Sequence, residues 1–308
     1  MRNLYLKVTN ACTLNCSFCY VGKQIKAKLN EDKLFCWLDK YFLLGEESTI
    51  IFHGGEPLLN MELVQKVLDK EYPARTSLTT NLIYVLDEEK IKLLKRIDDI
   101  SISYDIGKQR FKNEKQRNLW INNMRILERE GINVQINMVL TNELINSKPQ
   151  DLLDFLQSFN NIKYLHFERL TNTGNALHYP VSNWEEVDNW LCDLYKRSKI
   201  ILPEADEVSS CKQGKFYGCM DRECHKHMLT INPNGTIATC PNSFFDTFTT
   251  LDEDPEISLE RLSKKNIKRK YHTKCLSCER FEYCRGECPQ LSWYNDICPH
   301  LKKFSDLT

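Results

Sequence analysis

The chain has 308 residues, and its 42 Lys and Arg residues balance 42 Asp and Glu residues, so the formal net charge is zero. This balance gives no electrostatic support for binding nucleic acid or an anionic membrane surface. No stretch approaches the roughly 20 apolar residues of a membrane span, and the first residues lack a signal peptide's apolar region. We therefore expect a cytoplasmic protein.

Apolar strand-like runs alternate with helix-like patterns through the first two thirds of the chain. Strands are predicted at residues 4–8, 48–52, 76–80, 100–104, 134–140 and 164–167. Helices are predicted at residues 31–42, 61–70, 87–96, 119–130, 151–159 and 184–197. This alternation predicts an α/β fold with a parallel sheet, either open and doubly wound or an incomplete barrel. In both forms, ligands gather at the carboxyl ends of the strands.

Three cysteines, Cys12, Cys16 and Cys19, follow the first predicted strand at the spacing C-x3-C-x2-C. A four-iron cubane binds soft thiolates, and a tight loop supplies them at the separation it needs. Three thiolates leave one iron open for chemistry. A zinc site with its fourth ligand elsewhere is the alternative that the spacing alone leaves open. Fourteen cysteines without an export signal favour metal binding over disulfides.

The second predicted strand ends in Gly54-Gly55-Glu56-Pro57, where glycines allow a close approach of the backbone to a ligand. With the cysteine loop one βα unit earlier, this turn resembles the radical S-adenosylmethionine (SAM) enzymes. The resemblance implies that Cys12, Cys16 and Cys19 hold a [4Fe-4S] cluster whose open iron chelates SAM. It also implies that reductive cleavage yields a 5′-deoxyadenosyl radical, and that the Gly54–Pro57 turn contacts the methionine amino group.

Further residues resemble the SAM contacts of the same family. Ser103 precedes Tyr-Asp at the end of the fourth strand, where relatives carry Ser-x-Asp-Gly, and the glycine is displaced here to Gly107. The resemblance implies that Ser103 and Arg117 hold the carboxylate and ribose of SAM and that Phe18 packs against adenine. A solvated helix charge is the alternative for Arg117.

Two other strand ends follow the family in part. Thr80-Asn81 ends the third strand where many relatives have Thr-Asn-Gly, but Leu82 replaces the glycine. Glu168-Arg169 and Gly174-x-Ala176 follow the sixth strand as they do in the family. Ordinary turn residues at a strand end are the alternative for both.

Most of the remaining cysteines lie near the end of the chain, after a predicted hairpin at residues 229–237. A zinc ribbon would explain four of them, but it leaves Cys224, Cys240 and Cys298 without a role. The whole order resembles the SPASM extension of radical SAM enzymes, which holds two auxiliary [4Fe-4S] clusters. The resemblance assigns to auxiliary cluster I the residues Cys219, Cys224, Cys240 and Cys288, with Cys211 in reserve for Cys219. It assigns to auxiliary cluster II the residues Cys275, Cys278, Cys284 and Cys298.

The expected organisation is therefore a partial (β/α)6 TIM-like barrel at residues 1–203 and a small cysteine-rich α+β SPASM domain at residues 204–308. The remaining cysteines, Cys36 and Cys192, fall on apolar helix faces and are expected in the core. In sulfatase-maturating relatives an aspartate base follows the cysteine equivalent to Cys240. Here Pro241 follows, so that activity is not expected. No catalytic base is assigned.

The resemblance implies a radical SAM oxidoreductase that abstracts hydrogen from a ribosomally made peptide or protein, giving an oxidative modification such as a crosslink. The implied cofactors are SAM and three [4Fe-4S] clusters, and the implied electron donor is a flavodoxin or ferredoxin. Because the first strand begins at residue 3, we expect a leader peptide to be bound by the barrel and extension or by a separate protein. The alternatives are a dehydrogenase of a sugar or cyclitol alcohol and a noncatalytic zinc-bearing interaction protein.

Overall fold

The computed structural model describes residues 2–21, 27–171, 173–180, 183–213, 215, 226–242, 247–265, 271–288, 290–291, 293 and 295–308. The chain forms two compact units. The first unit consists of Met1–Asn15, Val21–Ser101 and His225–Ile267, and the second of Cys16–Tyr20, Ile102–Cys224 and Lys268–Thr308. The expected domain boundary at residue 203 stays a prediction.

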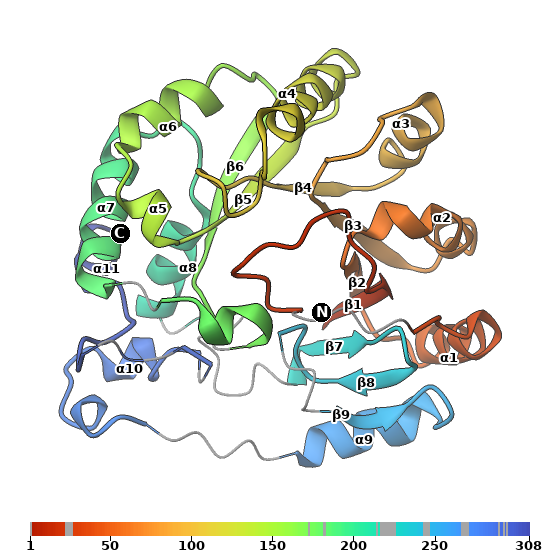
Figure 1. The fold of residues 1–308 in the computed structure, drawn as a ribbon. Coiled ribbons are helices and arrows are strands. Elements are labelled where there is room, and N and C mark those ends of the chain that lie inside the picture. Colours follow the sequence, from red (N-terminus) through yellow and green to blue (C-terminus); the bar gives the residue numbers. More distant parts are fainter. Residues whose placement is uncertain are drawn as a thin grey trace. The chain divides into compact units, whose positions relative to one another are not determined.

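Six strands of the first unit form a sheet in the order β3-β2-β1-β7-β8-β9 (Figure 1). They are β1 (Arg2–Thr9), β2 (Ser48–Gly54), β3 (Ala74–Thr80), β7 (Met228–Ile231), β8 (Thr236–Ala238) and β9 (Thr247–Thr250). The pairs β1–β2, β2–β3 and β1–β7 are parallel, whereas β7–β8 and β8–β9 are antiparallel. The predicted hairpin at residues 229–237 is confirmed, and it extends the sheet beside β1.

Helices follow the strands of the first unit. They are α1 (Glu31–Leu43), the 3-10 helix η1 (Pro57–Asn60), α2 (Met61–Asp69), α3 (Glu88–Leu94) and α9 (Pro255–Lys264). Helix α1 begins where the Asn30 side chain accepts a hydrogen bond from the Lys33 amide. Alternate residues of β1, Leu4 and Leu6, are fully buried, as is Trp37 of α1. This alternation places one face of β1 in the hydrophobic core.

The chain passes from the first unit to the second within β4 (Asp99–Ser103). In the second unit, β5 (Val134–Val139) pairs in parallel with β6 (Ile162–Glu168). The helical segments of this unit are α4 (Glu114–Arg129), α5 (Asn142–Ile145), α6 (Pro149–Leu156), η2 (Gly174–His178), α7 (Trp184–Arg197), α8 (Pro203–Lys212), η5 (Thr273–Cys275), α10 (Phe281–Cys284) and α11 (Lys302–Leu307). An aromatic cluster forms its core, with Tyr104, Trp120 and Phe155 in mutual ring contact.

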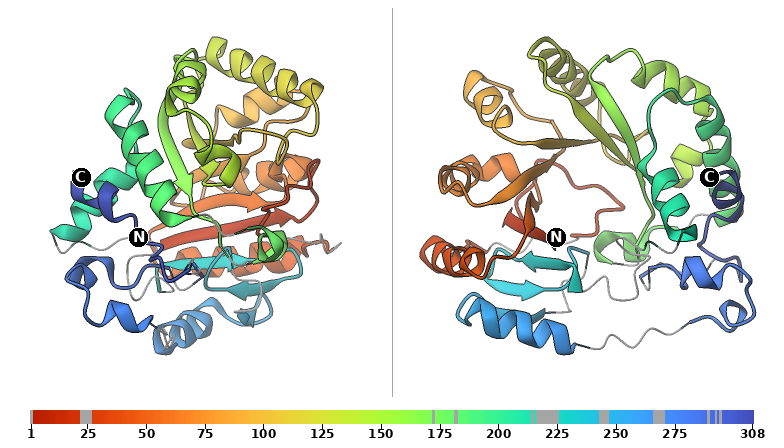
Figure 2. Two further views of the ribbon diagram at one scale, coloured as in Figure 1. Left: turned by 60° about the vertical axis from the view of Figure 1, so that its left-hand side comes forward. Right: turned by 180° about the vertical axis from the view of Figure 1, so that it is seen from behind.

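The C-terminal helix α11 lies beside α7 (Figure 2). Its first turn is capped by Asp188 of α7, whose carboxylate accepts hydrogen bonds from the amides of Lys303 and Phe304, both at 2.8 Å. These bonds satisfy amides that a helix start leaves without partners. They attach the cysteine-rich end of the chain to a helix of the α/β region.

The expected α/β class and all six predicted strands are confirmed. Helix α4 begins five residues before its predicted start because Asn113 caps it. The expectation for Cys192 is confirmed, since it is buried, but that for Cys36 is wrong, since Cys36 is exposed on α1. Within the described ranges, no helix is long and apolar enough to cross a membrane.

Candidate functional site

In the first unit, the loop after β1 presents Cys12 to two hydrogen-bond donors. The Leu14 amide lies 3.4 Å from Cys12 Sγ, and the Asn81 side-chain amide lies 3.5 Å from it. Asn81 follows β3, so ends of two parallel strands meet at this sulfur. Hydrogen bonds to sulfur stabilise a thiolate and tune a cluster that it binds.

The Gly54–Pro57 turn is packed against the backbone of the cysteine loop. The amides of Gly55 and Glu56 donate to the carbonyls of Thr9 and Ala11, both at 2.8 Å. A Cβ at Gly55 would lie 2.2 Å from the Ala11 oxygen, and one at Gly54 would lie 2.1 Å from the Thr9 oxygen. The glycines thus permit close contact with the protein's own loop. Their contact with SAM stays a prediction.

Gly55→Ala is expected to displace this loop, because the added methyl group cannot fit beside the Ala11 carbonyl. Overpacking of this kind lowers the free energy of unfolding by about 1–3 kcal/mol. We also expect a loss of iron bound at Cys12. Urea unfolding and iron analysis of anaerobically prepared protein measure both effects.

Gly45→Ala is the matched control, because its Cβ would meet open space. It should cost about 1 kcal/mol, since Gly45 has φ +75°, and should leave the iron content unchanged. Equal iron losses in the two variants would contradict the role assigned to Gly55.

Glu56 is fully buried and joins the ends of β2 and β3. Its carboxylate accepts hydrogen bonds from the Thr80 hydroxyl and the Asn81 amide, both at 2.8 Å. Pro57 begins η1, and the Glu56 side chain caps that turn. Leu82 adopts φ +59°, so the left-handed conformation is kept where many relatives have glycine.

In the second unit, the segment that holds Cys16 and Cys19 is clamped by the turn after β6. The Asn175 side chain donates to the Cys16 carbonyl at 3.0 Å, and the Asn175 amide donates to the Cys19 carbonyl at 2.9 Å. A Cβ at Gly174 would lie 2.2 Å from the Tyr20 oxygen. The Gly174-x-Ala176 motif therefore supports the cysteine segment directly.

Arg110 is a buried cation beside this segment that no sequence motif predicted. Its side chain forms an ion pair with the buried Asp105 at 2.6 Å and lies 5.6 Å from the ring of Phe18. Burial lowers the pKa of Arg110, but the charges of Asp105, Cys16 and Cys19 outweigh it, so that pKa is raised. A fixed positive charge thus lies near two of the predicted cluster ligands.

The predicted SAM contacts of the second unit lie in different surroundings. Phe18 is buried and makes an edge contact with Tyr179. The Ser103 carbonyl accepts a hydrogen bond from the Trp120 indole at 3.2 Å. Arg117 is 42% exposed and pairs with Glu114 at 3.8 Å. Of the two arginines, Arg110 is the one buried beside the cysteine segment.

Four of the C-terminal cysteines lie in the wall of one cavity in the second unit, with a volume of about 390 Å³. They are Cys275, Cys278, Cys284 and Cys298, the four residues that the sequence analysis assigns to auxiliary cluster II. Lys274, Arg280, Lys302 and Lys303 also line the cavity. We call this cavity the thiol pocket. Its four soft donors fit a thiolate-bound iron–sulfur cluster, and the carboxylates of Glu185, Asp188 and Asp296 in the same wall offset most of the positive charge.

The thiols of this pocket differ from exposed cysteines in acidity. Burial, with a smaller contribution from Glu287, raises the pKa of Cys284 to about 12. Burial also raises the pKa of Cys275 and of Cys298. Without a metal, these three thiols hold their protons at neutral pH. Metal binding must displace these protons, so it couples to pH and to the stability of the pocket.

The predicted ligands of auxiliary cluster I do not all lie within one described unit. Cys219 and Cys224 lie outside the described residues. Cys240 follows β8 in the first unit, Cys288 belongs to the second, and both are half-buried. Lys7 of β1 is fully buried and donates to the Pro241 carbonyl at 2.6 Å, directly after Cys240. Cluster I stays a prediction.

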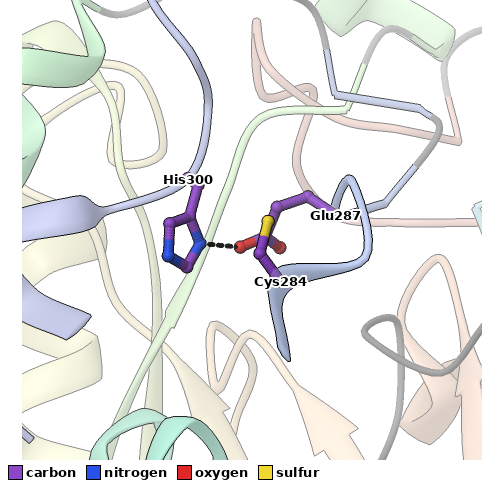
Figure 3. Close-up of side chains that lie close together, drawn as sticks. All are labelled: Cys284, Glu287 and His300. Atoms are coloured by element: carbon purple, nitrogen blue, oxygen red, sulfur yellow. Dashed lines mark hydrogen bonds and ion pairs between the residues drawn. The ribbon is translucent and has the colours of Figure 1, made fainter. Parts of the chain in front are cut away.

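A buried charged network borders the thiol pocket. One carboxylate oxygen of Glu287 lies 2.8 Å from the Arg169 guanidinium, and the other lies 2.5 Å from Nδ1 of His300. Although burial raises the pKa of Glu287, these two partners lower it to about 2. Figure 3 shows Cys284 beside the Glu287 carboxylate, with Nδ1 of His300 facing it.

Comparison with known proteins decides the family. The model of the radical SAM superfamily matches residues 6–156, which include the cysteine loop and strands β2 to β5. The chain belongs to the radical SAM superfamily. It is therefore an enzyme of a family that uses SAM and a [4Fe-4S] cluster, as the motifs predict.

Curated relatives of this radical SAM chain include an uncharacterized protein of Methanocaldococcus jannaschii. It is 33% identical over 260 residues, covering 78% of this chain and 85% of the relative. The chain is also 22% identical over 327 residues to the radical SAM cyclopropyl synthase TigE of Paramaledivibacter caminithermalis, covering 94% of this chain and 68% of TigE.

Solved structures share the fold. Native anSMEcpe with bound AdoMet matches with a TM-score of 0.73 and 16% identity, over 99% of this chain and 96% of that chain. Streptococcus suis SuiB bound to precursor peptide SuiA matches with a TM-score of 0.67 and 17% identity, over 97% of this chain and 76% of that chain. These matches confirm the expected fold class.

Proposed function

We propose that this radical SAM enzyme modifies a side chain of a ribosomally made peptide or protein oxidatively, for example by forming a crosslink. The observation that carries the proposal is the thiol pocket, whose four cysteines line one cavity outside the SAM-cluster motif. A cluster there gives the enzyme a one-electron acceptor. A substrate radical must lose an electron to form a new bond or a double bond, so an acceptor suits a reaction that ends in net oxidation.

The SAM cluster and its cofactor would be held by the cysteine loop and the strand ends beside it. Cys12, Cys16 and Cys19 would hold the cluster that binds SAM, supported by the donors to Cys12 and by the Gly174-Asn175 clamp. The proposed SAM contacts are Phe18, Gly54, Gly55, Glu56, Pro57, Ser103 and Arg117. Once loaded, these cofactors supply hydrogen abstraction from carbon, and the protein positions the substrate carbon and excludes water.

The C-terminal region would be a SPASM domain with two auxiliary clusters. Cluster II would occupy the thiol pocket. Cluster I would use Cys219, Cys224, Cys240 and Cys288, with Cys211 as the reserve for Cys219. A flavodoxin or ferredoxin would supply the electron for SAM cleavage, and a separate protein is a candidate for binding a leader peptide.

Two fold relatives support a peptide substrate. SuiB was solved with a precursor peptide, and anSMEcpe was solved with AdoMet and a peptide. Because their identities to this chain are 17% and 18%, their substrates serve here only as the basis of the proposal. Peptides encoded beside the gene are therefore the first substrates to test.

Incubation of the reconstituted enzyme with these peptides, SAM and a reductant is expected to give a product about 2 Da lighter per modified site, because a crosslink or double bond removes two hydrogens. Mass spectrometry measures this loss, and a mixture without SAM is the control. Turnover of a sugar or cyclitol alcohol, with all the peptides unchanged, would refute the peptide proposal and favour a small-molecule dehydrogenase.

A further inference from the structure

The charged network beside the thiol pocket contains three chemically different side chains close together. Cys284 Sγ, a carboxylate oxygen of Glu287 and a ring nitrogen of His300 all lie within 4.8 Å of one another, and all three residues are buried (Figure 3). Such a set could belong to a separate metal site, or it could act on a cluster held by the thiols. The partners of Glu287 distinguish these two cases.

Both carboxylate oxygens of Glu287 already face other groups. Arg169 contacts one at 2.8 Å, and Nδ1 of His300 contacts the other at 2.5 Å. A metal at Glu287 would have to replace one of these contacts and would meet the guanidinium charge. Cys284, for its part, lines the thiol pocket with three other cysteines. A separate mononuclear site is therefore disfavoured.

Glu287 is instead suited to carry a permanent charge. Its side chain is 3% exposed, so water screens that charge weakly, and its ion pair with Arg169 stabilises the ionised carboxylate. Glu287 lies on the loop after α10, between Cys284, the last residue of that helix, and Cys288. A negative charge fixed so close to a cluster thiolate opposes the addition of an electron to that cluster.

We infer that Glu287, held by Arg169 and His300, is a positioning residue that lowers the reduction potential of the cluster in the thiol pocket. This inference rests on the proposed function, because it requires a cluster bound to Cys275, Cys278, Cys284 and Cys298. A low potential would let that cluster pass the electron it receives from the substrate radical to an oxidised flavodoxin or ferredoxin, and so return to its oxidised state between turnovers.

The test is a dithionite titration of anaerobic protein, followed by electron paramagnetic resonance. It is done in a background in which the ligands of the SAM cluster and three ligands of the proposed auxiliary cluster I are replaced by Ala, so that only the cluster in the thiol pocket contributes. The replaced residues are Cys12, Cys16, Cys19, Cys219, Cys224 and Cys240. Glu287→Gln keeps the shape of the side chain and removes its charge. We expect it to favour the reduced state at least tenfold, which for a one-electron couple is a positive shift of about 59 mV.

Two further variants separate charge from structure. Glu287→Asp keeps the charge and should shift the equilibrium by less than half as much. Glu279→Gln also removes a carboxylate next to a predicted ligand, but Glu279 is 82% exposed and its charge is screened. In Glu279→Gln, we expect the equilibrium constant for reduction of the cluster to stay within about twofold of that of the parent protein.

Three results would overturn the inference. The first two are equal shifts of the reduction potential in Glu287→Gln and Glu279→Gln, or in Glu287→Gln and Glu287→Asp. The third is loss of the pocket's iron in Glu287→Gln, which would give Glu287 a structural role instead. Failure of the proposed function looks different, because the parent protein would then hold no iron in the thiol pocket. Iron analysis of the parent and of its Cys275→Ala form distinguishes these cases.

Discussion

Replacing Cys12, Cys16 and Cys19 together by Ala is expected to abolish the cleavage of SAM. The three thiolates are the proposed ligands of the cluster that delivers the electron to SAM, and without them this loop offers no thiolate to bind a cubane. We expect 5′-deoxyadenosine to fall to the level of a reaction without enzyme. Chromatography of anaerobic reactions with dithionite measures this product.

Cys36→Ala is the matched control, because Cys36 is an exposed thiol on α1 of the first unit. It should retain the full rate of 5′-deoxyadenosine formation. If the triple variant still formed this product above background, the assignment of these cysteines would be refuted. If Cys36→Ala lost activity as well, nonspecific sensitivity of the thiols would explain both results.

Replacing the four cysteines of the thiol pocket by Ala is expected to separate SAM cleavage from substrate modification. The variant should lose about four irons, the content of one cubane, from a parent total of about twelve. It should still form 5′-deoxyadenosine but give no modified product, because the substrate radical has lost its electron acceptor. Iron and sulfide analysis, product chromatography and mass spectrometry measure the three quantities.

Cys192→Ala is the control for this variant, because Cys192 is buried in the same unit but does not line the pocket. It should lower stability by about 1 kcal/mol, as loss of a small buried side chain does, and should retain all the iron. A parent protein that contains zinc and little iron would contradict the cluster assignments and support a zinc-binding role. Equal modification by the parent and the four-cysteine variant would refute the proposed electron acceptor.

Local patterns predicted the parts of the fold that depend on neighbouring residues. Apolar runs identified the six strands, and the Pro-Asn-Gly turn identified the hairpin between β7 and β8. Helix α8 and strand β9 were missed, since α8 has no clear apolar face and β9 is a short threonine-rich strand. The error at Cys36 has a related cause, because an apolar neighbourhood in sequence does not determine which way a helical side chain points.

In the candidate site, too, local features were predicted from the sequence and tertiary contacts were not. The order of the cysteines predicted a cluster at Cys275, Cys278, Cys284 and Cys298. All four line the thiol pocket, and their role as ligands stays a prediction. The close approach of Gly55 to the Ala11 carbonyl could not be read from the sequence, because it depends on contact between two separate strand ends. Arg110 was missed because nothing in its local sequence shows that the Arg110–Asp105 ion pair is buried.

By itself, the sequence determined the family and the residue types that carry its chemistry, because thiol spacing and short turns are local properties of the chain. Only the tertiary structure decided how these residues are supported. It placed two donors at Cys12, a buried cation beside Cys16 and Cys19, and the Glu287 carboxylate beside Cys284. The contacts of Asn81 with Cys12 and of Arg110 with the segment of Cys16 and Cys19 join residues far apart in the chain, so they depend on folding and leave no periodic signal in the sequence.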